Sequence, residues 1–109
     1  MIKKRTMDDY KMAGAYMRLL KTILPETIVA CSAVLYAKDT DRFLSAERAI
    51  SQICSRAEDN MFTDFPELGN EHIDIFYGAV GNKPRNDTDR EQVELAIKLV
   101  KEAFEDNWK

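Results

Sequence analysis

The sequence predicts an all-α protein: a compact bundle of about five helices that forms a single domain over residues 1–109. Apolar side chains recur at steps of three and four through most of the chain, and residues suited to helix caps precede several of these stretches. A hydrophobic fraction of 45% with 32% charged residues is typical of one globular core. We expect helices near residues 6–24, 26–38, 41–59, 70–81 and 88–108.

The first two predicted helices are the most apolar part of the chain. Thr6 and Asp9 have the spacing of a capping box, and an apolar stripe follows over residues 7–24. Pro25 is predicted to end this helix and begin the next, because proline suits the first turn of a helix. Residues 28–37 are almost entirely apolar, and their alanines favour a helix over a strand.

A helix that is apolar nearly all round has to be enclosed on every side in water. Five helices in one chain barely supply that enclosure, so we expect a homodimer built on the first two helices. The candidate dimer surface consists of Met12, Tyr16, Leu19, Ile28, Val29 and Leu35.

The remaining elements follow from turn residues and spacing. Residues 39–41 supply a turn and an N-cap for the third helix, and residues 60–69 form a connection. A short fourth helix is predicted after the cap residue Asn70, with a strand over residues 72–80 as the alternative. Its apolar positions fall at i, i+3, i+4 and i+7, and they are Ile73, Phe76, Tyr77 and Val80. The fifth helix is the clearest, since the capping box Thr88–Glu91 precedes it.

The charge distribution is uneven. Residues 57–82 contain six acidic side chains, no Lys or Arg, and four of the ten aromatic residues, whereas the first predicted helix is basic. The carboxylates either cap helices and solvate a loop, face the basic helix, or bind a protein partner. Aromatic side chains among carboxylates are typical of interaction segments. The candidate partner-binding residues are Glu58, Asp59, Phe62, Asp64, Phe65 and Glu67.

Patterns that carry catalysis are absent from the sequence. There is one histidine, no GxSxG motif, no phosphate-binding glycine loop and no calcium-loop spacing. We therefore expect no enzyme activity, cofactor or metal. The alternative is a small enzyme or cation-binding protein whose carboxylate/His site lies in residues 58–74, formed by Glu58, Asp59, Asp64, Glu71 and His72.

Partners and compartment are constrained less sharply. A second alternative is nucleic-acid contact by the basic N-terminal arm, which contains Lys3, Lys4 and Arg5 and is followed by Lys11, Arg18 and Lys21. A pI of about 5.2 disfavours it. Two separated cysteines, Cys31 and Cys54, suggest buried thiols in a reducing compartment, and the longest apolar run is too short for a bilayer. The sequence therefore predicts a small cytoplasmic protein-interaction or regulatory protein.

Overall fold

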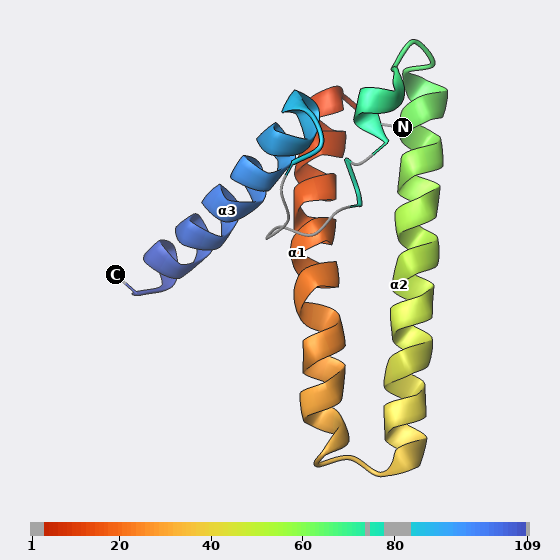
Figure 1. The fold of residues 1–109 in the computed structure, drawn as a ribbon, viewed down its shortest axis with the longest axis vertical. Helices are drawn as coiled ribbons and strands as arrows, with labels where there is room; N and C mark the ends of the chain where they lie inside the picture. The colour runs from red at the N-terminus through yellow and green to blue at the C-terminus, as the bar shows by residue number, and fades with distance from the viewer. Residues whose placement is uncertain (1–3, 74, 78–83, 109) are drawn as a thin grey trace.

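The computed structural model describes residues 4–73, 75–77 and 84–108 (Figure 1). It contains three α-helices, α1 (Met7–Ser32), α2 (Ala37–Asp64) and α3 (Asp87–Trp108), and one 3-10 turn, η1 (Asn70–His72). No strand occurs among the described residues. The all-α prediction is confirmed, and the prediction of five helices is wrong. In Figure 1, α1 and α2 form a long antiparallel hairpin, and α3 crosses the N-terminal half of α1 and then diverges from it.

One continuous helix, which ends at Ser32, replaces the predicted helices 6–24 and 26–38, so both the boundary predicted at Pro25 and the predicted end at residue 38 are wrong. Pro25 lies inside α1 and is exposed. A proline inside a helix costs about 3 kcal/mol. Leu24 and Ile28 lie on either side of it and are buried, 8% and 6% exposed. Burying two such side chains contributes about 3 to 6 kcal/mol, which offsets the cost of the proline.

The predicted turn at residues 39–41 lies inside α2. Tyr36, with extended backbone, is the N-cap residue, and α2 begins at Ala37. Four residues, 33–36, therefore connect the two helices of the hairpin. The Asp39 carboxylate lies in the first turn of α2, where an acidic side chain favours the positive end of the helix dipole.

The fourth predicted helix, 70–81, is also wrong as far as the structure describes it. α2 continues to Asp64, and η1 is a single 3-10 turn after a connection over residues 65–69. Ile75 and Phe76 are adjacent in sequence and both are buried, whereas Ile73 is 41% exposed. The 3-10 turn ends at His72, and residues 75–77 are not helical, so both side chains are buried from an irregular segment. Residues 74 and 78–81 of the prediction lie outside the described residues.

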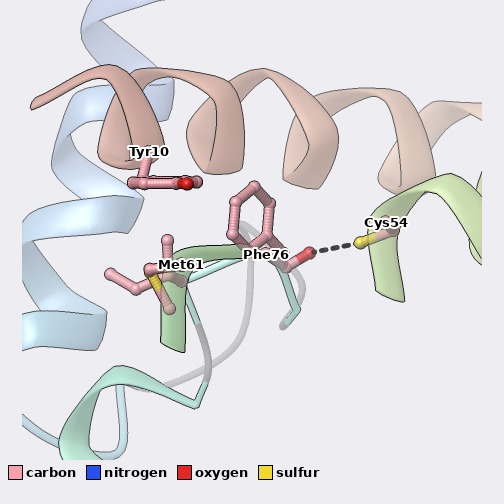
Figure 2. Close-up of a cluster of buried hydrophobic side chains, with 5 residues drawn as sticks. Tyr10, Cys54, Met61 and Phe76 are labelled. Atoms are coloured by element: carbon pink, nitrogen blue, oxygen red, sulfur yellow. Dashed lines mark hydrogen bonds between the residues drawn. The ribbon is translucent and has the colours of Figure 1, made fainter. Parts of the chain in front are cut away.

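Two hydrophobic clusters hold the helices together. The larger one lies between α1, α2 and the segment after η1, and Figure 2 shows Phe76 between the two helices with its carbonyl facing the Cys54 thiol. Its buried members are Tyr10, Cys54, Met61, Ile75 and Phe76. The smaller cluster packs α3 against α1 and consists of Ala15, Ala96 and Leu99, with Leu19 and Leu95 at its edge.

The helix starts follow the capping rules with one correction. Thr6 and Asp9 form the predicted capping box of α1, with both of its hydrogen bonds present. At α3, the Asp89 backbone N–H donates to the Asn86 side-chain oxygen at 2.7 Å. The cap of α3 is therefore Asn86 and not the predicted Thr88, because α3 begins at Asp87 and Thr88 lies inside it. None of the described helices combines the length and apolar character needed to cross a membrane.

Candidate functional site

One side of the α1–α2 hairpin carries two parallel rows of uncharged residues, and exposed large apolar side chains lie mainly in the α1 row. The α1 row steps by four, four, three and four residues, and the α2 row by three, four, four and three, so each row follows one face of its helix. The α1 row is Met12, Tyr16, Leu20, Ile23 and Thr27; the α2 row is Ala46, Ala49, Ile53, Ala57 and Asn60. Neither row contains a charged residue. We call these two rows the hairpin face.

The hairpin face lies opposite the segment that contains Ile75. Arg18 Nε donates to the Ile75 carbonyl, so Arg18 marks the side of α1 that this segment covers. Tyr16 and Leu20 are each two residues from Arg18, and two residues on an α-helix turn the side chain by about 200°. Both therefore project from the opposite side of α1.

The same geometry holds on α2. The Ser55 hydroxyl is hydrogen-bonded to the Tyr77 hydroxyl at 3.1 Å, which marks the covered side of α2. Ile53 is two residues earlier and projects from the other side. Tyr16, Ile23 and Ile53 are 56%, 58% and 58% exposed, so no described part of the chain covers this face.

The predicted dimer surface is only partly on this face. Met12 and Tyr16 belong to it and are exposed. Leu19 is half-buried against the α3 cluster, and Ile28 is buried against α2. Val29 and Leu35 are exposed elsewhere on the hairpin, Val29 at 72%. Leu20, Ile23 and Ile53 were missed, although their steps of three and four residues from other apolar positions could have identified them.

The acidic aromatic segment turns partly inward. Asp64 accepts hydrogen bonds from the Arg5 guanidinium, with Nε at 2.7 Å, and from the Tyr10 hydroxyl. These two donors hold the pKa of the Asp64 carboxyl below its ordinary value. Burial raises the pKa of Tyr10, and its hydrogen bond to Asp64 acts in the same direction. One carboxylate of the acidic segment thus contacts the basic N-terminal arm within the same molecule.

The two phenylalanines of that segment contact the core. Phe62 and Phe65 are half-buried against the larger cluster, and the Phe65 ring meets Tyr10 edge-on with 6.1 Å between centroids. Glu58 is half-buried, and Asp59 and Glu67 are exposed. The described surface of this segment therefore presents carboxylates more than aromatic rings.

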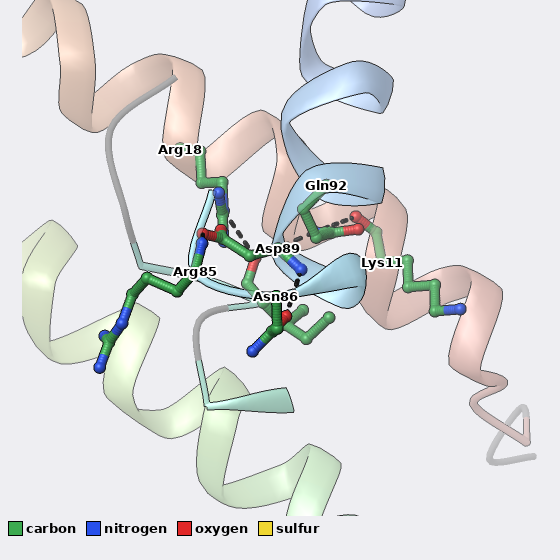
Figure 3. A network of polar contacts seen from close by, with 7 residues as sticks. Lys11, Arg18, Arg85, Asn86, Asp89 and Gln92 are labelled. Carbon is green, nitrogen blue, oxygen red and sulfur yellow. Dashed lines mark hydrogen bonds and ion pairs between the residues drawn. The ribbon is translucent and has the colours of Figure 1, made fainter. Parts of the chain in front are cut away.

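A buried polar network joins α1, α3 and the segment after η1 (Figure 3). Arg18 Nη2 lies 2.5 Å from Asp89 Oδ1, and Gln92 Nε2 donates to the carbonyls of Ile75 and Lys11, each at 3.0 Å. Burial alone would raise the pKa of Asp89, but the Arg85 backbone N–H and the Arg18 guanidinium bind its carboxylate and bring the pKa below its ordinary value. The network has a structural role, because its side chains bind one another and backbone groups where α1, α3 and the segment after η1 meet.

Sequence reasoning missed this network, although Gly14 gives a signal for it. Gly14 is buried in the middle of α1, one turn before Arg18. A β-carbon built there would lie 2.3 Å from the Ile75 carbonyl oxygen and 2.9 Å from Gln92 Nε2. A glycine inside an apolar helical pattern often marks such a close backbone approach.

Groups able to do chemistry are scattered. His72 Nδ1 lies 3.4 Å from a Glu71 carboxylate oxygen, and no group of three or more His, Cys, Asp or Glu side chains in the described part of the chain is arranged to hold a metal ion. Cys54 is buried, which raises the pKa of its thiol. Of the proposed carboxylate/His set, Asp64 binds Arg5 and Tyr10, and Glu71 is in contact with His72.

The basic residues near the N-terminus are mostly used within the protein. Arg5 binds Asp64, Arg18 is buried, and the Lys21 ammonium lies 4.7 Å above the Tyr77 ring. Lys4 is exposed, and Lys3 lies outside the described residues.

A cavity of about 360 Å³ lies between the helices of the hairpin near Leu24 and Ile50. Its charged walls are Lys21, Glu47 and Arg48. Two cations and one anion share this rim, so both signs of charge are present around the cavity.

Comparisons with known proteins do not assign the chain to a family. Comparison with protein families, curated proteins and solved structures found no match to the chain.

Proposed function

We propose that this is a small, non-enzymatic helical protein-interaction or regulatory protein that binds a protein partner through the hairpin face. The observation that carries the proposal is the exposure of Tyr16, Ile23 and Ile53 in two uncharged rows. Protein–protein interaction sites are among the surfaces that contiguous exposed apolar side chains mark on soluble proteins.

The chemistry of the polar groups supports the same function. The strongest charged pair, Arg18 with Asp89, is buried among backbone partners and joins two helices. The Cys54 thiol has a raised pKa and is enclosed, the opposite of an activated nucleophile. These polar groups therefore favour binding of a partner through apolar contacts over catalysis as the function of the protein.

The test is site-specific photo-crosslinking in cells that produce the protein. A photoreactive benzoylphenylalanine replaces Tyr16, which is aromatic and exposed, and a matched control replaces Glu94, which is exposed on α3. We expect a protein adduct from position 16 and none from position 94. Adding Ile53→Glu on the same face should abolish the adduct, since a charge there disfavours burial. The absence of any adduct at position 16, or one that survives Ile53→Glu, contradicts the proposal.

The cation-binding alternative is separated by metal titration. A ligand that binds only the folded state raises thermal stability by mass action. We expect the melting temperature to be unchanged by Ca²⁺, Mg²⁺ or Zn²⁺. A rise that disappears in Glu71→Gln would favour the carboxylate/His site in residues 58–74 instead.

A further inference from the structure

We propose that the partner of the hairpin face is a second copy of this chain, and that two hairpins join by a two-fold axis into a four-helix bundle. This inference rests on the proposed function, because it uses the same face. It adds the identity of the partner and the arrangement: α1 of each copy lies over α2 of the other.

The two rows of the hairpin face complement each other in size. The α1 row carries large side chains such as Tyr16 and Ile23, and the α2 row carries small ones, Ala46 and Ala49, both exposed. Large residues opposite small ones interdigitate, and a two-fold axis presents the same patch from both sides. An α1 row over an α2 row therefore pairs large with small at both halves of the interface.

The register of the hairpin places these residues at matching heights. Tyr10 and Met61 share the larger core cluster, and Leu24 and Glu47 line one cavity further along the hairpin. Since the helices are antiparallel, Ile23 lies level with residues 46–49 of its own chain. A two-fold axis along the hairpin keeps heights equal, so Ile23 of one copy meets Ala46 and Ala49 of the other.

The charge and the area of the face also fit a second copy. Neither row contains a charge, so self-association creates no like-charge contact across the rows. The five large members of the face are each between 42% and 58% exposed. With about 200 Å² for a fully exposed large side chain, they leave about 500 Å² per copy. Two copies would bury about 1,000 Å² from these side chains alone, the lower limit for a specific interface.

The distal half of the hairpin supplies a further reason. Figure 1 shows α3 diverging from α1, so in the described part of the chain α1 and α2 continue as a pair beyond the crossing. Leu24 and Ile28 fill the seam between them, and the hairpin face remains open beside that seam. A second hairpin completes the four-helix packing that two long antiparallel helices otherwise lack.

The first test measures mass in solution by light scattering after size exclusion, over a concentration series. We expect the wild type to have twice the 12.5 kDa chain mass. Ile23→Glu and Ala49→Glu should both give the single-chain mass with unchanged far-UV circular dichroism, because both sites are exposed in one copy. Val29→Glu is the matched control: Val29 is more exposed than Ile23, lies on the same helix, and is turned about 120° away from it. Its mass should stay that of the wild type.

The second test fixes the arrangement by disulfide cross-linking in a Cys31→Ser background. Separate Ile23→Cys and Ala49→Cys chains are mixed and oxidised, and we expect a mixed, covalently linked dimer. A mixture of Val29→Cys and Ala49→Cys should stay unlinked, since a disulfide needs Cα atoms within about 7 Å.

Single-chain mass for the wild type at every concentration overturns the inference, as does a dimer that Val29→Glu breaks and Ile23→Glu does not. Rapid linkage of Ile23→Cys to itself, without the mixed product, overturns the α1-over-α2 arrangement. These outcomes are distinct from failure of the proposed function. If the protein is a monomer and position 16 still cross-links to a different protein, the proposed function stands and the second copy is excluded as the partner.

Discussion

Gly14 offers the sharpest test of how α3 and the segment at Ile75 sit on α1. In an open helix, Gly→Ala stabilises by about 1 kcal/mol. Here the new methyl carbon would lie 2.3 Å from the Ile75 carbonyl oxygen and 2.8 Å from Cγ2 of the Ile75 side chain. The backbone must move away, and that oxygen accepts from both Arg18 and Gln92. We predict that Gly14→Ala destabilises the protein.

The magnitude follows from three contributions. Inserting a methyl into a packed site costs about 1 to 3 kcal/mol. Weakening a hydrogen bond from Gln92 and a charged one from Arg18 costs about 1 to 2 kcal/mol more. The gain in helix propensity offsets about 1 kcal/mol. The net loss for Gly14→Ala is about 1 to 4 kcal/mol, with a central value of about 2.5 kcal/mol.

Urea unfolding followed by far-UV circular dichroism measures this loss. With a slope of about 1.5 kcal/mol per molar urea, the midpoint should fall by roughly 1.5 M. Protein concentration is held fixed, since self-association would add to stability. Ala13→Gly, at an exposed neighbour in the same helix, calibrates propensity alone and should cost about 1 kcal/mol. A Gly14→Ala protein that is more stable than the wild type would refute the close approach.

Three further predictions concern the polar and thiol groups. Arg18→Met should lower the free energy of unfolding by about 3 to 5 kcal/mol, because it leaves Asp89 buried without its ion-pair partner. The double variant Arg18→Met with Asp89→Leu should recover most of that loss in urea unfolding. Equal losses in the single and the double variant would contradict this. The lowered pKa values of Asp64 and Asp89 mean that the folded state binds fewer protons than the unfolded state. The stability they contribute should be full above a pH of about 4 and should fall as the pH drops below it. Asp89→Asn should reduce this dependence of the unfolding free energy on pH. Burial and a raised pKa should protect the Cys54 thiol, so in Cys31→Ser, labelling by iodoacetamide at neutral pH should be complete only after urea unfolding.

Local signals predicted the helical class, the capping box at Thr6 and the last helix to within one residue of its start. These features depend on neighbours within one turn. The boundary at Pro25 failed because tertiary burial of Leu24 and Ile28 outweighs the local cost of proline. The fourth helix failed for a related reason: an accidental helical spacing in a short segment cannot outweigh a core that buries both Ile75 and Phe76.

The acidic segment shows what one chain's charge pattern can and cannot predict. A negative segment opposite a basic first helix suggested a contact between them, and the ion pair that forms joins Asp64 to Arg5, which lies just before that helix. The inward turn of Phe62 and Phe65 depends on where Tyr10 lies, which no local pattern contains. Side chains that seemed to be anchors for a partner therefore help to close the core.

The fusion of the first two predicted helices changes what the apolar stretch 28–37 implies. A separate helix, apolar all round, would need neighbours on every side. Residues 28–32 of this stretch end α1 and residues 33–36 connect it to α2, so the stretch buries Ile28 and leaves Val29 and Val34 exposed. One more layer over the hairpin face would cover Tyr16, Ile23 and Ile53 together. The layer that we propose is the hairpin face of a second copy, which is uncharged and would place its mostly small α2 row against these large α1 side chains.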